Sequence, residues 1–228
     1  MSYLVVLCEG ETEKYFVSNV LNEYLWKRGG HIVRPESFGK KVKNDVATAP
    51  GGVLEYEPVY RHITAALRQY SAETSFVTMM TDLYAFPRDF PNYEALARTA
   101  NPYERVTALE TAIRNQVNSE RFIPYIQLHE FEALTLSSKE HFKKAFDTNR
   151  HKSVDNLFRE IQGLAPEEVN QTVEGAPSKR ILSHLVGYNK VRMGASITKS
   201  IGVEALKASC PHFGEWIERL CRLPSVSV

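Results

Sequence analysis

The chain has 228 residues, of which 43% are hydrophobic and 24% are charged, and its formal net charge is +1 at pH 7. A chain of this length and hydrophobicity can bury a full core, whereas disordered chains combine low hydrophobicity with high net charge. The balanced charge also excludes a broadly basic nucleic-acid coat, so a local patch or metal ions would have to hold any polyanion.

The cysteines and the apolar segments indicate where the protein works. Cys8, Cys210 and Cys221 lack the close pairing of zinc sites and are odd in number, which favours reduced thiols in a cytosolic protein. The apolar run at 4–8 is too short for a signal peptide, and no stretch approaches the ~20 apolar residues of a membrane span. The sequence therefore predicts a soluble, cytoplasmic protein without a membrane partner.

The chain opens with a strand that leads directly into a helix. Residues 3–8 form an apolar run rich in branched side chains, as expected of a strand buried on both faces. Gly10 follows, and apolar residues at 16–25 then recur at the offsets of three and four that are typical of a helix. Glu9 is thus predicted at the carboxyl end of a buried strand, the edge at which open α/β sheets bind ligands.

Three acidic residues occupy five positions at this turn, namely Glu9, Glu11 and Glu13. A helix dipole favours carboxylates in the first turn by ~0.3–1 kcal/mol each, which explains Glu11 and Glu13 without any ligand. Glu9 precedes the helix and should point into the crevice at the strand end. Metal binding is the functional interpretation of that position.

A second strand and a basic loop come next. Gly29-Gly30 ends the first helix, residues 31–33 form the strand, and Pro35 limits it. The loop at 39–52 carries three lysines, for which two interpretations stay open: solvated charges, or contacts to phosphate groups. These lysines are Lys40, Lys41 and Lys43.

The middle of the chain alternates helices with buried strands. Such alternation predicts an α/β fold with a mostly parallel sheet that is covered by helices. The expected elements are helices at 59–70 and 102–119, strands at 76–80 and 122–128, and a proline-containing aromatic loop at 83–91.

Acidic residues follow three of these strands. Glu9 follows the first, Asp82 closes the strand at 76–80, and Glu130 and Glu132 come after the strand at 122–128. A parallel sheet brings these ends to one edge, where uncompensated carboxylates repel one another and take up protons. A divalent cation removes that conflict, and oxygen ligands without histidine or cysteine pairs favour Mg2+ or Mn2+ over zinc.

From residue 139 onward the pattern is wholly helical. No Gly/Ser linker separates this part from the rest, so we predict an α/β core at 1–138 and a helical extension at 139–228 that completes the same domain. The expected helices lie at 139–146, 153–162, 179–186, 197–209 and 213–223.

The extension contains a basic helix start. A glycine-proline turn leads to Ser178, a candidate helix cap, and Lys179 and Arg180 follow in the first turn. Cations are disfavoured at that end of a helix, so two of them suggest an anion such as phosphate. The structural alternative is a cap followed by solvated charges.

Five motifs in this order resemble the TOPRIM-like family known as domain of unknown function 4276, over nearly the whole chain. The resemblance implies the TOPRIM sheet that is also found in topoisomerases, primases and overcoming-lysogenization-defect nucleases. The motifs are Cys8-Glu9-Gly10-Glu11-Thr12-Glu13, Thr81-Asp82-Leu83-Tyr84 with Pro87, His129-Glu130-Phe131-Glu132-Ala133-Leu134, Ala176-Pro177-Ser178-Lys179-Arg180, and Cys210-Pro211-His212-Phe213 with Trp216.

The resemblance implies magnesium-dependent phosphodiester chemistry. TOPRIM enzymes use a glutamate after the first strand, matched by Glu9, and an Asp-x-Asp after a later strand, of which Asp82 matches the first member. Tyr84 stands in the place of the second aspartate, so Glu130 or Glu132 would supply the missing ligand. Lys179 matches a late catalytic lysine of the related nucleases. The predicted ligands are Glu9, Asp82, Glu130 and Glu132, supported by Glu13 and His129, with Ser178, Lys179 and Arg180 as the phosphate-binding residues.

Two functions remain open. The first is a Mg2+-dependent nuclease that cuts DNA or RNA and works with an AAA- or ABC-type ATPase encoded nearby in an anti-phage defence system, as the resemblance implies. Both a single chain and a homo-oligomer stay open for it. The second is a non-catalytic metal-binding partner or sensor of such an ATPase, favoured by the balanced charge and by Tyr84. A phosphatase with Asp82 as nucleophile is disfavoured, because no aspartate lies two residues further on to act as its acid.

Overall fold

The computed structural model describes residues 2–37, 54–170 and 175–225. Its sheet is parallel in every strand pair, in the order β2-β1-β3-β4, with β5 pairing with the far end of β3. The predicted fold class, a mostly parallel α/β sheet covered by helices with a helical C-terminal extension, is confirmed. The strands are β1 (Ser2–Cys8), β2 (His31–Ser37), β3 (Ser75–Asp82), β4 (Phe122–Ile123) and β5 (Ile126–Gln127).

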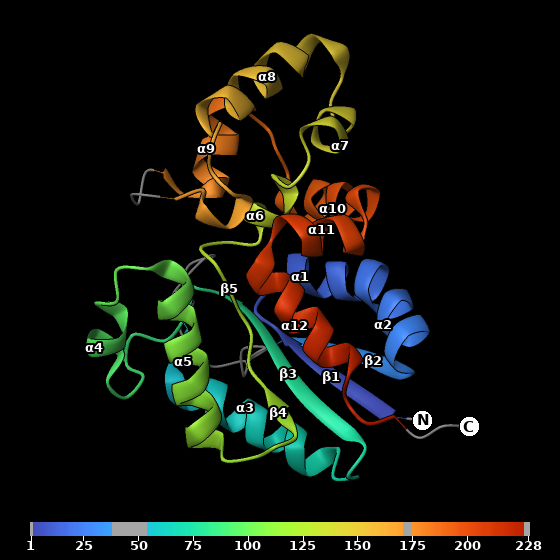
Figure 1. The fold of residues 1–228 in the computed structure, drawn as a ribbon, viewed down its shortest axis with the longest axis vertical. Helices are drawn as coiled ribbons and strands as arrows, with labels where there is room; N and C mark the ends of the chain where they lie inside the picture. The colour runs from blue at the N-terminus through green and yellow to red at the C-terminus, as the bar shows by residue number, and fades with distance from the viewer. Residues whose placement is uncertain (1, 38–53, 171–174, 226–228) are drawn as a thin grey trace, which may run out of the picture.

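Helices cover both faces of this sheet (Figure 1). They are α1 (Glu11–Phe16), the π-helix η1 (Val17–Leu21), α2 (Asn22–Gly29), α3 (Tyr56–Gln69), α4 (Tyr93–Ala97), α5 (Pro102–Val117), α6 (Glu132–Thr135), α7 (Lys139–Lys144), the 3-10 helix η2 (Thr148–Arg150), α8 (His151–Glu160), the 3-10 helix η3 (Pro166–Glu168), α9 (Pro177–His184), the π-helix η5 (Lys190–Gly194), α10 (Ala195–Ile201), α11 (Val203–Ser209) and α12 (Pro211–Cys221).

Side chains of β1 alternate between two apolar layers, as the period of two in a strand requires. Val5 and Leu7 pack with α3 and α5 on one face. Leu4 and Val6 belong to the layer on the other face, which contains α1, α2 and the helices from α7 to α12. Because this second layer runs continuously from β1 to the C-terminal helices, we infer that the extension at 139–228 completes the same domain.

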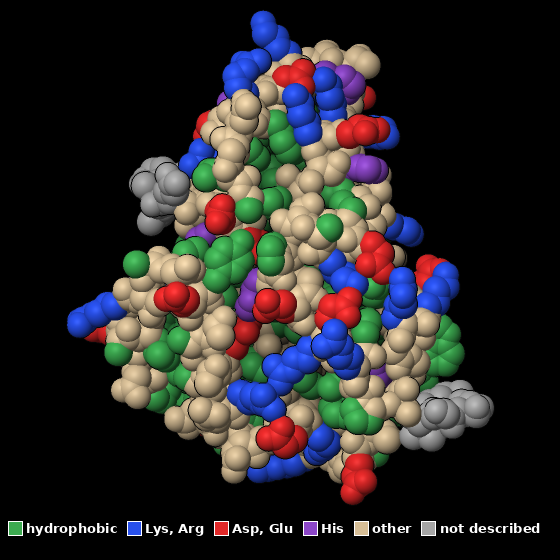
Figure 2. All heavy atoms as spheres, viewed as in Figure 1, with side chains coloured by type: hydrophobic (Ala, Val, Ile, Leu, Met, Phe, Trp, Pro, Cys, Tyr) green, Lys and Arg blue, Asp and Glu red, His purple; other side chains and the backbone are tan. Residues whose placement is uncertain are grey.

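Two features of the molecule concern its surroundings: the distribution of charge on its surface and the apolar content of its helices. Acidic and basic side chains are interspersed over the face shown in Figure 2. In the described ranges, no helix has the length and apolar content that crossing a membrane requires.

Two predicted strands have different limits, and each contains a proline: one strand continues through it and the other is divided by it. The strand at 31–33 continues to Ser37 through Pro35, because β2 is an edge strand and pairs on one side only. The strand at 122–128 is divided into β4 and β5 at Pro124, which has no N–H to donate to a ladder.

Several predicted helices also have different limits. The helix at 197–209 is two helices, separated by Gly202 with φ +84°, a conformation that favours glycine. The helices at 179–186 and 213–223 begin two residues earlier, at Pro177 and Pro211, since proline suits the first helical position. Helix α4 was not predicted, because it has only five residues, too few to show a helical period in the sequence.

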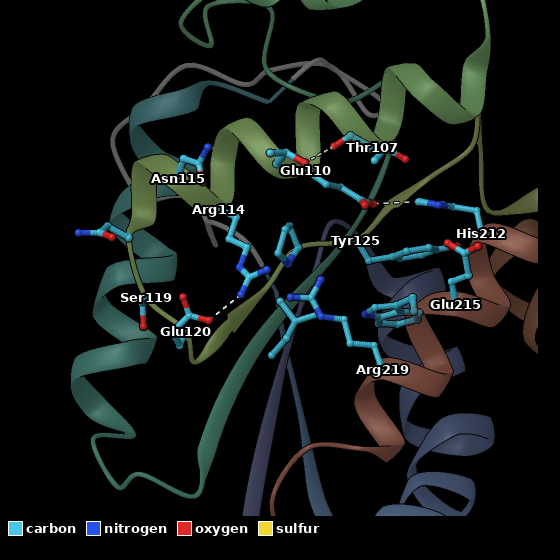
Figure 3. A pocket seen from close by; sticks show the side chains of 15 residues that line it. Thr107, Glu110, Arg114, Asn115, Ser119, Glu120, Tyr125, His212, Glu215 and Arg219 are labelled. Carbon is cyan, nitrogen blue, oxygen red and sulfur yellow. Dashed lines mark hydrogen bonds and ion pairs between the residues drawn. The ribbon is translucent and has the colours of Figure 1, made fainter.

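Helices α5 and α12 face each other across the open side of β4. Among the described strands, β4 pairs with β3 alone. A cavity of about 500 Å³ lies between the two helices, and its lining includes Tyr125 and Trp216 (Figure 3). These two rings are stacked with their centroids 4.2 Å apart, and the Trp216 indole N–H donates to Thr78 Oγ1 of β3 at 3.0 Å.

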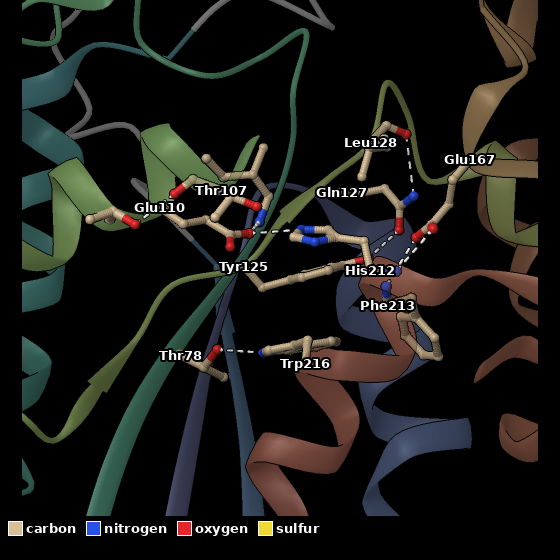
Figure 4. A network of polar contacts seen from close by, with 12 residues as sticks. Thr78, Thr107, Glu110, Tyr125, Gln127, Leu128, Glu167, His212, Phe213 and Trp216 are labelled. Carbon is tan, nitrogen blue, oxygen red and sulfur yellow. Dashed lines mark hydrogen bonds and ion pairs between the residues drawn. The ribbon is translucent and has the colours of Figure 1, made fainter. Parts of the chain in front are cut away.

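Glu167 anchors the start of α12 (Figure 4). Its side chain is fully buried, and its two carboxylate oxygens accept the backbone N–H groups of His212 and Phe213, each at 3.0 Å. The His212 ring in turn lies 2.9 Å from Glu110 Oε1 on α5. Glu167 thereby holds α12 against the sheet and positions the aromatic side chains that fill the space above it.

Replacing Glu167 by alanine should destabilise the fold by roughly 2–4 kcal/mol, because two buried N–H groups lose their acceptors. Urea denaturation measures this change in the free energy of unfolding. Glu168→Ala is the matched control, since Glu168 is the exposed neighbour. A loss for Glu167→Ala no larger than that for Glu168→Ala would show that water replaces the missing acceptors.

Candidate metal centre

The carboxyl ends of β1 and β3 are joined by Glu9. Its Oε2 accepts the backbone N–H of Asp82 at 2.9 Å and the Thr81 hydroxyl at 3.1 Å. The parallel register places these neighbouring strand ends at one edge, so residues more than seventy positions apart in the chain meet there. The convergence expected for Glu9 and Asp82 is therefore present.

Two further carboxylates lie at the same edge and are buried. Glu13 in α1 is 3% exposed, and its Oε2 accepts the Gly10 N–H at 2.9 Å. Glu132 opens α6 and is fully buried, while Asp82 is 6% exposed. Within the described residues, Asp82 Oδ1 and both carboxylate oxygens of Glu132 are buried without a hydrogen-bond partner. Such oxygens are costly in a folded protein, which marks this edge as an unsatisfied anionic centre.

The protonation of these groups reflects the crowding. Burial raises the pKa of Glu9 to about 7 and that of Glu132 to about 7. Burial is also the main cause that raises the pKa of Asp82 well above its usual range, and the charges of Glu9 and Glu13 add to it. The pKa of Glu13 is raised by burial as well. A bound cation would reverse all of these shifts, because it favours the ionised form.

Among the described residues, Lys190 faces this cluster. Its Nζ lies 3.7 Å from Glu132 Oε2, and its side chain is 44% exposed. Burial alone would lower the pKa of Lys190. The nearby negative charges of Glu132, Asp82, Glu13 and Glu130 have a larger effect, so the pKa is raised above its ordinary value. Lys190 therefore stays protonated and is electrostatically coupled to the whole cluster.

Sequence reasoning missed Lys190. It opens the π-helix η5, which follows a loop and packs against α1. The chain around it, Tyr188-Asn189-Lys190-Val191-Arg192, shows no apolar periodicity and no charge pattern. Its one local signal is Asn189, whose side chain accepts the Arg192 N–H at 3.0 Å as a cap. That signal marks a helix start but not a functional lysine.

Glu130 serves the start of α9. Its Oε2 accepts the backbone N–H of Ser178 at 2.9 Å. The basic helix start suggested that an anion binds there, and in this structure the carboxylate of Glu130 takes that place. Ala176, not Ser178, precedes the helix, and its side chain makes no capping hydrogen bond. The remaining charge of Glu130 acts on Glu132 and Lys190.

The two basic residues near the start of α9, Lys179 and Arg180, differ in their partners. Arg180 forms an ion pair with Glu160 and donates its Nε–H to Gly175 O at 2.7 Å. Lys179 is exposed, and in the described part of the chain its side chain makes no hydrogen bond or ion pair. The structure therefore places Lys190, rather than Lys179, beside the carboxylates. The basic loop at 39–52 lies outside the described residues.

His129 supports the edge as a neutral group. It adopts φ +63°, which is strained for a residue other than glycine. Burial lowers its pKa to about 4, so the ring is uncharged at pH 7. Its Nδ1 lies 3.2 Å from Asn170 Nδ2, and its ring centroid is 5.8 Å from that of Tyr84. Tyr84, two residues after Asp82, is 37% exposed at this edge.

The donor atoms fit magnesium or manganese in kind. All are carboxylate oxygens, and three of them are buried without a hydrogen-bond partner. Over the described ranges, no group of three or more His, Cys, Asp or Glu side chains is placed so that it could hold a metal ion. Mg2+ commonly binds through one or two carboxylates and completes its shell with water and substrate phosphate, so such a group is not required.

Comparisons with known proteins identify a family and one structural likeness. The model of the family described as "Domain of unknown function (DUF4276)" matches residues 8–221. No curated protein matches the chain. Three structures of the C-terminal region of the Xanthomonas campestris pv. campestris OLD protein, phased with mercury, platinum and iodine, are similar at 11–12% identity and a TM-score of 0.38, covering 95–96% of both chains. The fold itself is defined by the strand pairing of this chain.

Proposed function

The chain belongs to the family described as Domain of unknown function (DUF4276), and we propose that it is a Mg2+-dependent nuclease that hydrolyses phosphodiester bonds of DNA or RNA. One observation carries this proposal: buried carboxylates with oxygens that lack a hydrogen-bond partner share a sheet edge with the protonated Lys190. Such an arrangement combines a seat for a divalent cation with a fixed positive charge for a phosphate.

Each residue has a distinct part in this proposal. One or two of the carboxylates of Asp82, Glu132 and Glu9 would hold Mg2+ or Mn2+ together with water and phosphate oxygens, and Glu130 would add a ligand if it leaves Ser178. A bound divalent ion polarises the scissile phosphate and generates a water nucleophile. The Asp82 N–H and the Thr81 hydroxyl fix the orientation of Glu9. Lys190 would stabilise the negative charge that develops on the phosphate in the transition state.

The motif resemblance extends the proposal to partners. We propose that the protein is cytoplasmic, binds nucleic acid, and acts with an AAA- or ABC-type ATPase encoded nearby, as part of an anti-phage defence system. The balanced net charge supports dependence on a partner, since it gives the chain little long-range attraction for a polyanion of its own.

The direct test is hydrolysis by the purified chain, alone and together with the adjacent ATPase. Single- and double-stranded DNA and RNA are offered with Mg2+ or Mn2+. Glu9→Gln should abolish both metal binding and cleavage, while Glu11→Gln, the exposed neighbour on the same turn, should retain both. If nothing is cut under any condition, and Glu9→Gln keeps its cellular effect, the nuclease proposal fails.

A second function is favoured by two observations. Tyr84 stands where the motif resemblance implies a second aspartate, and among the described residues no three His, Cys, Asp or Glu side chains are placed so that they could hold a metal ion. A non-catalytic metal-binding partner or sensor of an ATPase would need the cation for stability alone. In that case Mg2+ would change the binding of the chain to the ATPase or the rate of ATP hydrolysis, and Glu9→Gln would remove this effect although no nucleic acid is cut.

A further inference from the structure

The cavity between α5 and α12 is separate from the carboxylate cluster and has its own charged lining. Arg114 enters it from α5, and Arg219 enters it from α12 (Figure 3). Figure 2 shows Lys and Arg side chains gathered over the region between these helices, with acidic side chains beside them. The lining includes none of the carboxylates proposed to hold the metal.

The two arginines are unequally neutralised. Arg114 pairs with Glu120 at 2.7 Å. Among the described residues, the Arg219 side chain makes no ion pair and no hydrogen bond. Burial lowers the pKa of Arg219, and the charge of Arg114 lowers it further, against the weaker opposing effects of Glu110 and Glu120. Two guanidinium groups that repel each other inside a cavity favour an anion between them.

The remaining lining selects among anions. Glu110 and Glu215 present carboxylates in the same cavity, and Glu120 stands at its rim with a side chain that is 93% exposed. These acids would repel an extended polyanion such as a nucleic-acid backbone. They can accept hydrogen bonds from hydroxyl or amino groups of a small molecule. A volume of about 500 Å³ falls in the range of roughly 300–1,000 Å³ that is typical of small-molecule sites.

We propose that this cavity binds a small phosphate ester that carries hydroxyl or amino groups, with its phosphate held between Arg114 and Arg219. Guanidinium groups bind phosphate in a bidentate manner, which suits two of them arriving from opposite walls. Among the described residues, Glu110 forms no ion pair with either arginine; its Oε1 lies 2.9 Å from His212 Nε2 and accepts the Ile126 N–H at 2.7 Å.

Isothermal titration of the full chain tests this site. The probes are inorganic phosphate and ribose 5-phosphate, in low salt and without divalent ions. Both should bind, ribose 5-phosphate more tightly. Arg219→Ala should weaken each by at least about tenfold, the loss expected when a hydrogen bond to a charged group is removed. Arg222→Ala is the matched control, because Arg222 directly follows the same helix and its side chain is 80% exposed and pairs with Glu218. This variant should bind as the wild type does.

Three further measurements decide the outcome. Glu9→Gln should bind ribose 5-phosphate normally, so that failure of the nuclease proposal does not affect this one. A single-stranded oligonucleotide that binds more tightly than ribose 5-phosphate and loses that affinity in Arg219→Ala would overturn the small-molecule assignment. The site itself would be overturned if neither probe binds at about 10 mM. It would also be overturned if Arg219→Ala unfolds at the wild-type temperature and still binds both probes as tightly as the wild type does.

Discussion

Lys190→Ala should lower the rate of phosphodiester cleavage by about a hundredfold or more, while metal binding survives. The size follows from the removal of one preorganised group that stabilises developing charge in the transition state. Metal binding should survive because an ammonium group coordinates no cation, and Lys190 lies 3.7 Å from the nearest carboxylate oxygen. Single-turnover cleavage and titration with Mn2+ measure the two properties separately.

Lys179→Ala is the informative comparison. The motif resemblance assigns the catalytic lysine to Lys179, whereas the geometry places Lys190 at the carboxylates and leaves Lys179 exposed on α9. We expect Lys179→Ala to keep cleavage within a few-fold of the wild-type rate. The reverse result is that Lys179→Ala no longer cleaves while Lys190→Ala still does. It would show that α9 moves to the metal edge when substrate binds and that the resemblance identified the right residue.

The strand ends were predictable because the chemistry that places them is local. A run of branched apolar residues ending in Glu9, and another ending at Asp82, already identify two buried strands and the side at which they finish. Parallel pairing then follows from the helices between them. The family assignment predicted from the motifs is confirmed by the match over residues 8–221.

The cation was not predictable, because nothing local marks it. Lys190 reaches the cluster only after η5 packs against α1 and α6, so its position depends on contacts across more than a hundred residues. The basic helix start is the opposite case. Lys179 and Arg180 form a pattern that suggests phosphate, but the fold supplies Glu130 to the helix N-terminus and Glu160 to Arg180. A charge pattern in sequence cannot show which partner the tertiary structure brings to it.

Buried acids resist prediction for the same reason. Glu11 and Glu13 look equivalent in a first helical turn, yet Glu11 is exposed and Glu13 is buried against the Gly10 N–H. A Cβ at Gly10 would come within 3.0 Å of Glu13 Oε2. Glycine at this position thus allows the carboxylate to approach the backbone closely, which a helix pattern alone does not reveal.

The second large effect concerns stability and pH in the absence of divalent ions. Burial holds the pKa of Glu9 and that of Glu132 at about 7 in the folded chain, compared with 4.5 for an ordinary glutamate, and it raises the pKa of Asp82 and that of Glu13. A group whose pKa is raised by folding contributes stability below its unfolded pKa and loses it as pH rises through the folded value. The metal-free protein should therefore melt at a lower temperature at pH 8 than at pH 5.5.

Mg2+ should reverse this loss, and the reversal should depend on pH. Because the ion binds the ionised carboxylates of the folded chain, it stabilises by mass action, and the gain should be larger at pH 8, where no proton competes, than at pH 5.5.

Asp82→Asn removes one of the repelling charges and one ligand, so this variant should lose less stability between pH 5.5 and pH 8 and gain less from Mg2+. Asp147→Asn changes an exposed aspartate far from the cluster in sequence and serves as the control. Thermal unfolding of the three proteins at both pH values, with and without Mg2+, gives the comparison. Equal Mg2+-induced shifts in Asp82→Asn and in the wild type would place the ion elsewhere, and a shift that does not change with pH would mean that the buried carboxylates are not its ligands.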